Sequence, residues 1–116
     1  MRASIYAIGL ASVLSAALPA LAADGNAAAG KLKDSTCQGC HGIPDYRTAF
    51  PDVYSVPKIG GQHAAYIVKA LQAYKSGERN HPTMKAIAAT LSDQDMADLA
   101  AFYSAPVGAP TSASAK

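Results

Sequence analysis

The sequence contains few of the side chains that usually fill a hydrophobic core. After residue 22 it has four Leu, four Ile, four Val and two Phe, so large apolar residues number 14 of 94, or about 15%. It has no Trp, and 26 of its 116 residues are Ala. A chain with so few large apolar residues is expected to stay disordered when its net charge is also high. Here the net charge is only +2, and the apolar residues recur at regular spacings. We therefore expect a folded chain whose interior is completed by something other than side chains.

Charged residues and cysteines are also scarce, and each shortage excludes a class of protein. Charged residues make up 16% of the chain, which argues against a polyanion-binding tail and against nucleic acid as a partner. The two cysteines, Cys37 and Cys40, cannot supply the disulfide framework of a small exported protein, because a bridge between them would close too short a loop. With 116 residues, the chain has room for one domain at most.

The one long apolar run lies at the N-terminus. Residues 1–22 begin with Arg2, carry no further charge, and break at Pro19 ahead of small residues that suit a peptidase site. This pattern is typical of a secretory signal peptide, with cleavage before Ala23. The alternative is an uncleaved membrane anchor, against which Pro19 and the small-residue site argue. We expect residues 1–22 to be removed and the mature chain to be exported.

The two cysteines belong to a C-x-x-C-H motif formed by Cys37, Cys40 and His41. One helical turn presents both sulfurs to the two vinyl groups of a haem, and the imidazole then lies under the iron as the proximal ligand. Two alternatives fit less well. A thioredoxin-type site would need a βαβ context, and a zinc knuckle would need a second pair of ligands at short spacing. The motif predicts one covalent haem c with its iron, and this group would also supply the missing core.

The sequence from residue 24 to residue 105 resembles the class I c-type cytochromes, particularly the small bacterial periplasmic ones and either half of the di-haem kind. The matching segments are residues 28–31, 37–42, 57–62, Met84 and residues 91–100. The resemblance implies an all-α domain with the cytochrome c fold, in which about four helices surround the haem. We place this domain at residues 23–105. Residues 106–116, rich in Ala, Pro, Ser and Thr, are predicted to be a disordered tail.

Local signals predict where the helices begin and end. Asn26 can cap a first helix that runs from about Ala27 into the haem site, and Gly30 would let another helix approach it closely. A second helix fits residues 63–76, with Gly77 after its end, and a short third one fits residues 83–89. A capping box of Ser92 and Asp95 predicts a last helix that runs to about Tyr103. One face of it carries Met96, Leu99, Ala100 and Tyr103, which in the family packs across the first helix.

The sixth ligand of the iron decides the function, and four residues are candidates for it. Met96 lies mid-helix among core positions, and His63 is better read as a polar residue at a helix start. Met84 follows His81 and matches the axial methionine of the family. Its alternative is a core position, in a stripe at helical spacing that could also line the haem face. We predict Met84 as the ligand, with His81, His63 or an open position as the alternatives.

The resemblance implies further contacts to the haem. In the family a proline at the position of Pro57 offers its carbonyl to the Nδ1 proton of the proximal imidazole; the alternative is a simple loop proline. Gly61, Gln62 and Tyr74 are predicted to contact the haem as well. Residues 42–56 should form an irregular loop whose aromatic residues either cover the haem edge or form a docking surface for a partner.

These predictions favour a one-electron carrier rather than an enzyme. If Met84 fills the sixth position, no site on the iron is free for a small-molecule substrate, whereas an open position would suit a gas sensor or a peroxidase-like enzyme. A structural or assembly role is the third alternative. The expected location is the periplasm, and the expected partners are redox proteins: a membrane oxidoreductase, a terminal oxidase or a periplasmic dehydrogenase. We expect a monomer or transient complexes, and the small net charge predicts weak long-range steering of partners.

Overall fold

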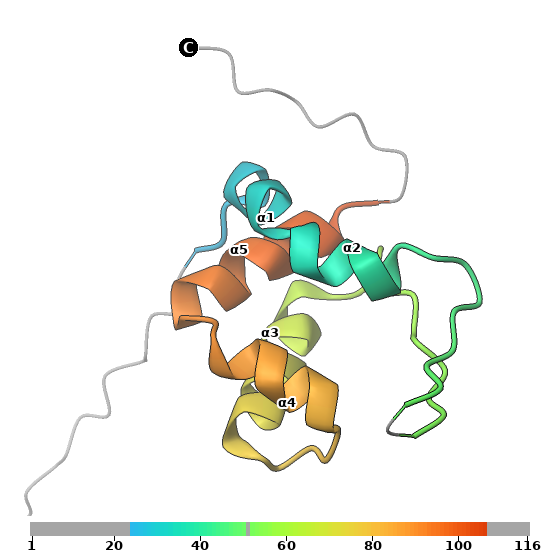
Figure 1. Ribbon diagram of the computed structural model, residues 1–116. Coiled ribbons are helices and arrows are strands. Elements are labelled where there is room, and N and C mark those ends of the chain that lie inside the picture. The colour runs from blue at the N-terminus through green and yellow to red at the C-terminus, as the bar shows by residue number, and fades with distance from the viewer. Residues whose placement is uncertain (1–23, 51, 107–116) are drawn as a thin grey trace, which may run out of the picture.

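The computed structural model describes residues 24–50 and 52–106, and the described chain is almost entirely helical (Figure 1). Its helices are α1 (Ala27–Lys33), α2 (Ser35–His41), α3 (Ala64–Ser76), α4 (Pro82–Ala89) and α5 (Asp93–Ser104). The described residues contain no strand, and their one β-bridge joins Arg47 to Ser55 within the loop before α3. The predicted signal peptide and the predicted tail beyond Pro106 lie outside the described residues.

Most helix boundaries follow the local signals in the sequence. The Asn26 side chain accepts a hydrogen bond from the Ala29 N–H at 3.0 Å at the start of α1. Gly77, at a φ of 86°, ends α3 in the left-handed conformation that glycine adopts readily. Ser92 and Asp95 form the predicted capping box of α5, with each side chain accepting from the other's backbone N–H. The predicted boundaries of these helices agree with the structure to within one residue or two.

The predicted first helix is divided in two at Asp34, which ends α1 and begins α2. The Asp34 side chain is buried, and it accepts hydrogen bonds from Gln38 on α2 and from the Tyr103 hydroxyl on α5. The helix is thus divided at a residue that is bound by Tyr103, 69 positions later in the sequence. The haem motif therefore lies on a short helix of its own, and the described residues form five helical segments.

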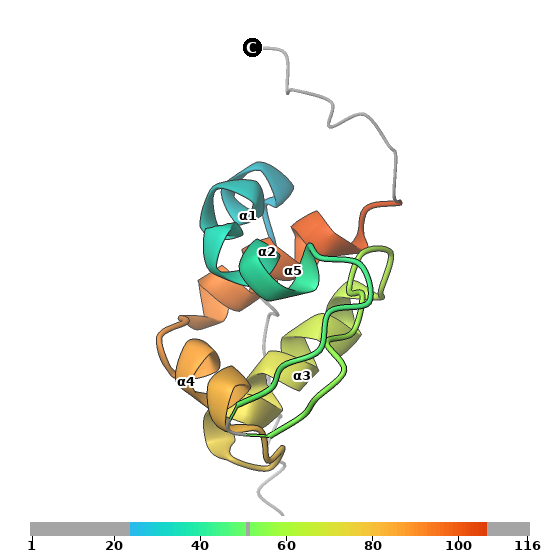
Figure 2. The same cartoon turned by 45° about the vertical axis from the view of Figure 1, so that its right-hand side comes forward.

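Helix α1 crosses α5 at very short range, as the two views of the ribbon show (Figures 1 and 2). A Cβ atom built on Gly30 would lie 2.1 Å from the Asp98 carbonyl oxygen, so glycine is required at this position. The same applies to Gly25, where a Cβ would lie 2.0 Å from the Ala97 oxygen. The close approach predicted for Gly30 is confirmed, and it depends on contact between backbones.

A Gly30→Ala substitution should therefore lower the stability of the haem-loaded protein by about 1 to 3 kcal/mol, because the added methyl group must push α5 away. Thermal melts followed by circular dichroism would measure the loss. Gly39→Ala is the matched control, since Gly39 also lies in a helix but a Cβ there meets nothing within 4 Å. Equal losses from the two substitutions would contradict the role of close packing at Gly30.

A buried carboxylate ties the N-terminal segment to α5. Asp98 accepts hydrogen bonds from the Asn26 N–H at 2.8 Å, from Lys33 Nζ at 2.6 Å and from Gln94 Nε2 at 2.9 Å. These donors, Lys33 first, lower the pKa of Asp98 to about 2. Lys33 also contacts Asp95 at 2.7 Å, and hydrogen bonds from Lys33 and Ser92 hold the pKa of Asp95 well below its usual range.

Acid should weaken this link. A carboxyl with a lowered pKa stabilises the folded state above its unfolded pKa of about 3.9, and that contribution is lost as the pH falls toward the folded value. Asp98→Asn should therefore lower the Tm most above about pH 4, and the difference from wild type should shrink as the pH approaches about 2, where half of the Asp98 carboxyl groups are protonated. A difference in Tm that stays constant over this range would rule out the ionised Asp98 as its source.

The core formed by side chains is small, as the composition predicts. Among the described residues, the buried apolar side chains are Ile67, Ala88, Met96, Ala97, Leu99 and Ala100. Met96 has no exposed surface, in agreement with its assignment as a core residue. No helix in the described part of the chain is long and apolar enough to cross a lipid bilayer.

Candidate functional site

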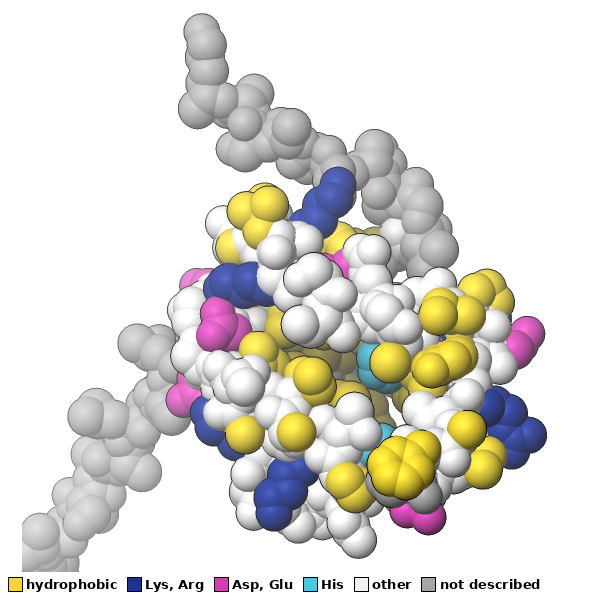
Figure 3. All heavy atoms as spheres, in the orientation of Figure 1, with side chains coloured by type: hydrophobic (Ala, Val, Ile, Leu, Met, Phe, Trp, Pro, Cys, Tyr) yellow, Lys and Arg dark blue, Asp and Glu magenta, His cyan; other side chains and the backbone are white. Residues whose placement is uncertain are grey.

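A cavity of about 580 Å³ lies where a core would be expected. Its walls come from α2, the loop before α3, and helices α3, α4 and α5. The lining is mostly apolar and includes Val56, Ile59, Ile67, Leu71, Ile87, Leu91 and Leu99. The space-filling view shows a hollow in which histidine side chains are visible among hydrophobic ones (Figure 3). The volume falls within the range of about 300 to 1,000 Å³ found for cofactor sites.

The haem motif forms one wall of this cavity. Cys37, Cys40 and His41 all line it from α2, and the two cysteines are not joined by a disulfide. Burial raises the pKa of the Cys37 thiol, so this group is protonated at neutral pH as long as it remains a thiol. Both cysteines line the cavity from one turn of α2, three residues apart, as attachment to two vinyl groups requires.

The proximal imidazole is oriented by the backbone of the following loop. His41 Nδ1 lies 2.7 Å from the carbonyl oxygen of Pro57. Because a carbonyl can only accept, Nδ1 must carry the proton, and Nε2 is left with a free lone pair. The hydrogen bond implied by the family resemblance is thus present, and it leaves Nε2 of this cavity-lining ring able to bind a metal.

The structure separates the four candidates for the sixth ligand. Met84 and His81 both line the cavity, from the first turn of α4 and the residue before it. In both ribbon views α4 lies across the molecule from α2, which carries His41 (Figures 1 and 2). His63 is exposed and Met96 is buried, and neither lines the cavity. Among the cavity-lining pair, His81 uses Nδ1 to accept a hydrogen bond from the Met84 N–H at 3.3 Å.

Three other predicted haem contacts differ in position. Gln62 and Tyr74 line the cavity, from the end of the loop and from α3. Gly61 does not line it; at a φ of 81° it forms a turn, and its N–H donates to the Tyr103 carbonyl at 2.7 Å. Gly61 thus links the loop to α5.

The family model for cytochrome c matches residues 22–104 of the chain. The chain belongs to the cytochrome c family. As a cytochrome c it carries covalent haem c with its iron, attached through Cys37 and Cys40 of the C-x-x-C-H motif, and it is a protein of electron transport. The donor set and the apolar cavity described above fit that group.

Relatives of this cytochrome c include both short and long proteins. Cytochrome c-554(548) of Halomonas halodenitrificans is 42% identical over 83 residues, which are 69% of this chain and 95% of the relative. Cytochrome c4 of Pseudomonas aeruginosa is 40% identical over 81 residues, which are 70% of this chain but only 38% of the relative. The crystal structure of reduced cytochrome c4 from Pseudomonas stutzeri matches with a TM-score of 0.57 and 35% identity, covering 71% of this chain and 46% of that one. The chain thus spans less than half the length of the cytochrome c4 proteins.

The loop before α3 contributes to the haem site of this cytochrome c in a way that the sequence left open. Its two arms are joined by hydrogen bonds of 2.9 Å from the Thr48 N–H to the Tyr54 carbonyl and from the Val56 N–H to the Tyr46 carbonyl. This pairing places Tyr54 in the cavity wall. Phe50 is 88% exposed and does not line the cavity. The aromatic residues of the loop therefore divide, and Tyr54 is the one that lines the haem cavity.

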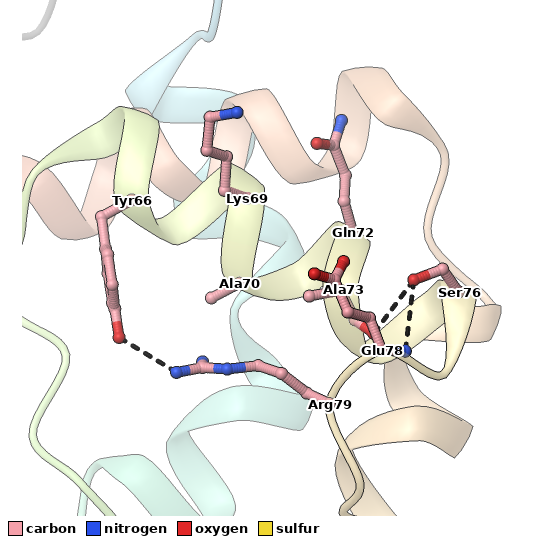
Figure 4. Close-up of a pocket in the computed structure, with 8 residues that line it drawn as sticks. All are labelled: Tyr66, Lys69, Ala70, Gln72, Ala73, Ser76, Glu78 and Arg79. Atoms are coloured by element: carbon pink, nitrogen blue, oxygen red, sulfur yellow. Dashed lines mark hydrogen bonds between the residues drawn. The ribbon is translucent and has the colours of Figure 1, made fainter.

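Arg79 is a further cavity-lining residue, to which the sequence analysis assigned no specific role. It lines the haem cavity and also a second hollow of about 490 Å³ on the outer side of α3. Figure 4 shows this hollow, with the Arg79 guanidinium donating to the Tyr66 hydroxyl at 3.1 Å. The guanidinium carbon also lies 5.2 Å from the centre of the Tyr74 ring. Arg79 thus holds a positive charge at the boundary between the haem cavity and the surface.

Proposed function

We propose that this cytochrome c is a periplasmic one-electron carrier whose single haem iron is bound by His41 and Met84. The observation that carries the proposal is that both residues line one apolar cavity, while the bond from His41 Nδ1 to Pro57 leaves Nε2 free to bind. When bound, the haem supplies a one-electron iron couple. A methionine sulfur in the sixth position leaves no site on the iron for a substrate, so we infer electron transfer and no enzyme activity.

The residues of the chain would hold the group and adjust its potential. Cys37 and Cys40 would fix it to α2, and the Pro57 carbonyl would keep the His41 ring in one orientation and one tautomer. Ile67, Leu71 and Leu99 line the cavity with apolar side chains and would exclude water from the haem. This exclusion disfavours the more highly charged ferric state. Together these features favour a positive reduction potential and a site that changes little between oxidation states.

The location and partners follow from the sequence and from one relative. We infer that residues 1–22 are a signal peptide, that residues 23–105 form the haem domain, and that the mature protein begins at Ala23 in the periplasm. A relative from Stutzerimonas stutzeri, 38% identical over 69 residues, is named thiosulfate dehydrogenase electron acceptor. Periplasmic dehydrogenases, membrane oxidoreductases and terminal oxidases are accordingly the partner classes that we propose. N-terminal sequencing that read Met1 would contradict this location.

Spectroscopy and redox titration of the purified haem protein test the function. We expect one reversible one-electron wave, the weak far-red absorption band of ferric haem with a sulfur ligand, and no binding of carbon monoxide by the ferrous protein. The alternative, a gas sensor or a peroxidase-like enzyme, requires an open sixth position. Tight binding of carbon monoxide with no far-red band would therefore overturn the electron-carrier assignment.

A further inference from the structure

The residue before α4 makes contacts on three sides. His81 is half-buried and lines the haem cavity, although it lies outside the C-x-x-C-H motif. It is the N-cap of α4, in an extended conformation with a φ of −155° and a ψ of 109°. Its Nδ1 accepts the N–H of Met84 at 3.3 Å, and its carbonyl accepts the N–H of Lys85 at 2.9 Å. Both bonds act on the first turn of the helix, which is the turn that carries Met84.

The other side of the imidazole ring is held by two tyrosines. The ring centre of Tyr54, from the loop before α3, lies 4.1 Å from that of His81. The ring of Tyr74, from α3, approaches edge-on with its centre 6.3 Å away. His81 thus connects three walls of the cavity: the loop, α3 and the start of α4. A small polar cap such as Ser or Asp would satisfy the same N–H but could not make these ring contacts.

We propose that His81 is a positioning residue that fixes where the Met84 side chain enters the haem cavity. The inference rests on the proposed function, because it concerns the methionine ligand. The Met84 backbone is held by the imidazole, and the imidazole is held by Tyr54 and Tyr74, so the first turn of α4 has one position relative to the other walls. Loss of His81 frees this turn, and Met84 then competes less well with other ligands for the iron.

The chain offers a matched control at the start of α3. His63 is likewise the N-cap of its helix and is also in an extended conformation, with a φ of −62° and a ψ of 130°. It makes no side-chain capping bond, is exposed, and does not line the cavity. The two histidines therefore occupy the same position in their helices, but only His81 has the contacts that the proposal requires.

Titration of the full-length ferric haem protein with imidazole tests the proposal, with loss of the far-red sulfur band as the signal. We expect His81→Ala to bind imidazole at least about fivefold more tightly than wild type, which corresponds to about 1 kcal/mol, the usual effect of a lost helix cap. His81→Asn keeps a capping oxygen but loses both ring contacts, so it should recover only part of the wild-type resistance. His63→Ala should match wild type. Equal imidazole affinities for wild type and His81→Ala would overturn the proposal.

Further variants keep the test decisive if His81→Ala does not fold. Tyr54→Leu removes the ring contact and leaves the capping bond, and it should raise the imidazole affinity by a smaller factor. If His81→Asn and Tyr54→Leu both bound imidazole with wild-type affinity, the capping bond alone would explain the role of His81. The proposed role of its ring contacts with Tyr54 and Tyr74 would then be overturned. Loss of the sulfur band in Met84→Ala shows that the proposed ligand is correct, independently of His81. A band that survives Met84→Ala would contradict the proposed function itself.

Discussion

Replacing Met84 with His should lower the reduction potential of the haem by at least about 0.1 V while the protein stays folded. A thioether is a soft, neutral ligand that favours ferrous iron, whereas imidazole is a stronger donor to ferric iron. Met84 lines the cavity from the first turn of α4 and is only half-buried, so the site can take a side chain of similar size. Redox titration of the two proteins under identical conditions would measure the shift.

Two alanine variants show whether the shift belongs to this methionine. Met84→Ala should open the sixth position to imidazole and carbon monoxide. Met96→Ala should do neither, because Met96 is fully buried and does not line the cavity, and it should cost about 2 to 4 kcal/mol of packing. A strong change of potential in Met96→Ala, together with an unchanged spectrum in Met84→Ala, would move the axial ligand to α5.

The Cys37→Ser, Cys40→Ser double variant should hold no haem and should be mostly unfolded. Without the haem, the chain must leave a cavity of about 580 Å³ at its centre. The apolar side chains that line it would then face water or empty space, and either would cost a large part of the small free energy by which a domain is usually stable. The few buried side chains, most of them on α5, cannot offset that cost.

Far-UV circular dichroism and thermal melts of this double variant would measure the effect. A broad transition with little helix is expected. Cys37→Ser alone is the control, because it keeps one thioether position and His41 and should retain more helix. A cooperative, native-like melt of the haem-free chain would show that the helices pack without the haem.

The sequence predicted those parts of the fold that depend on neighbouring residues. Asn26, Gly77 and the Ser92 capping box act within one helical turn, so their pattern marks the ends of helices directly. The break at Asp34 could not be read in the same way, because its partner Tyr103 lies 69 residues away. Burial and the hydrogen bond to Asp34 raise the pKa of Tyr103, so its hydroxyl remains a donor to this carboxylate.

The site shows the same division between local and distant signals. The C-x-x-C-H motif identified Cys37, Cys40 and His41 because attachment chemistry requires that spacing. Nothing in the spacing alone distinguished Met84 from His81, and the family resemblance was needed to predict Met84. Tyr54 lines the cavity because of the path of the loop before α3, and Arg79 because of the path of the chain after α3. These paths are set by tertiary structure and leave no local signal in the sequence.

The packing of α1 against α5 sets the order in which the molecule can be completed. The Asn26 N–H reaches the Asp98 carboxylate across 72 residues of chain, so the first helix has no partner until the last one has been made. Export from the N-terminus, as proposed above, would therefore deliver α2 to the far side of the membrane while α5 is still behind it. During that interval the two thiols are not enclosed by the finished fold and remain accessible for haem attachment. Closure over so long a loop is slow, which lengthens the time available for the thioether bonds to form.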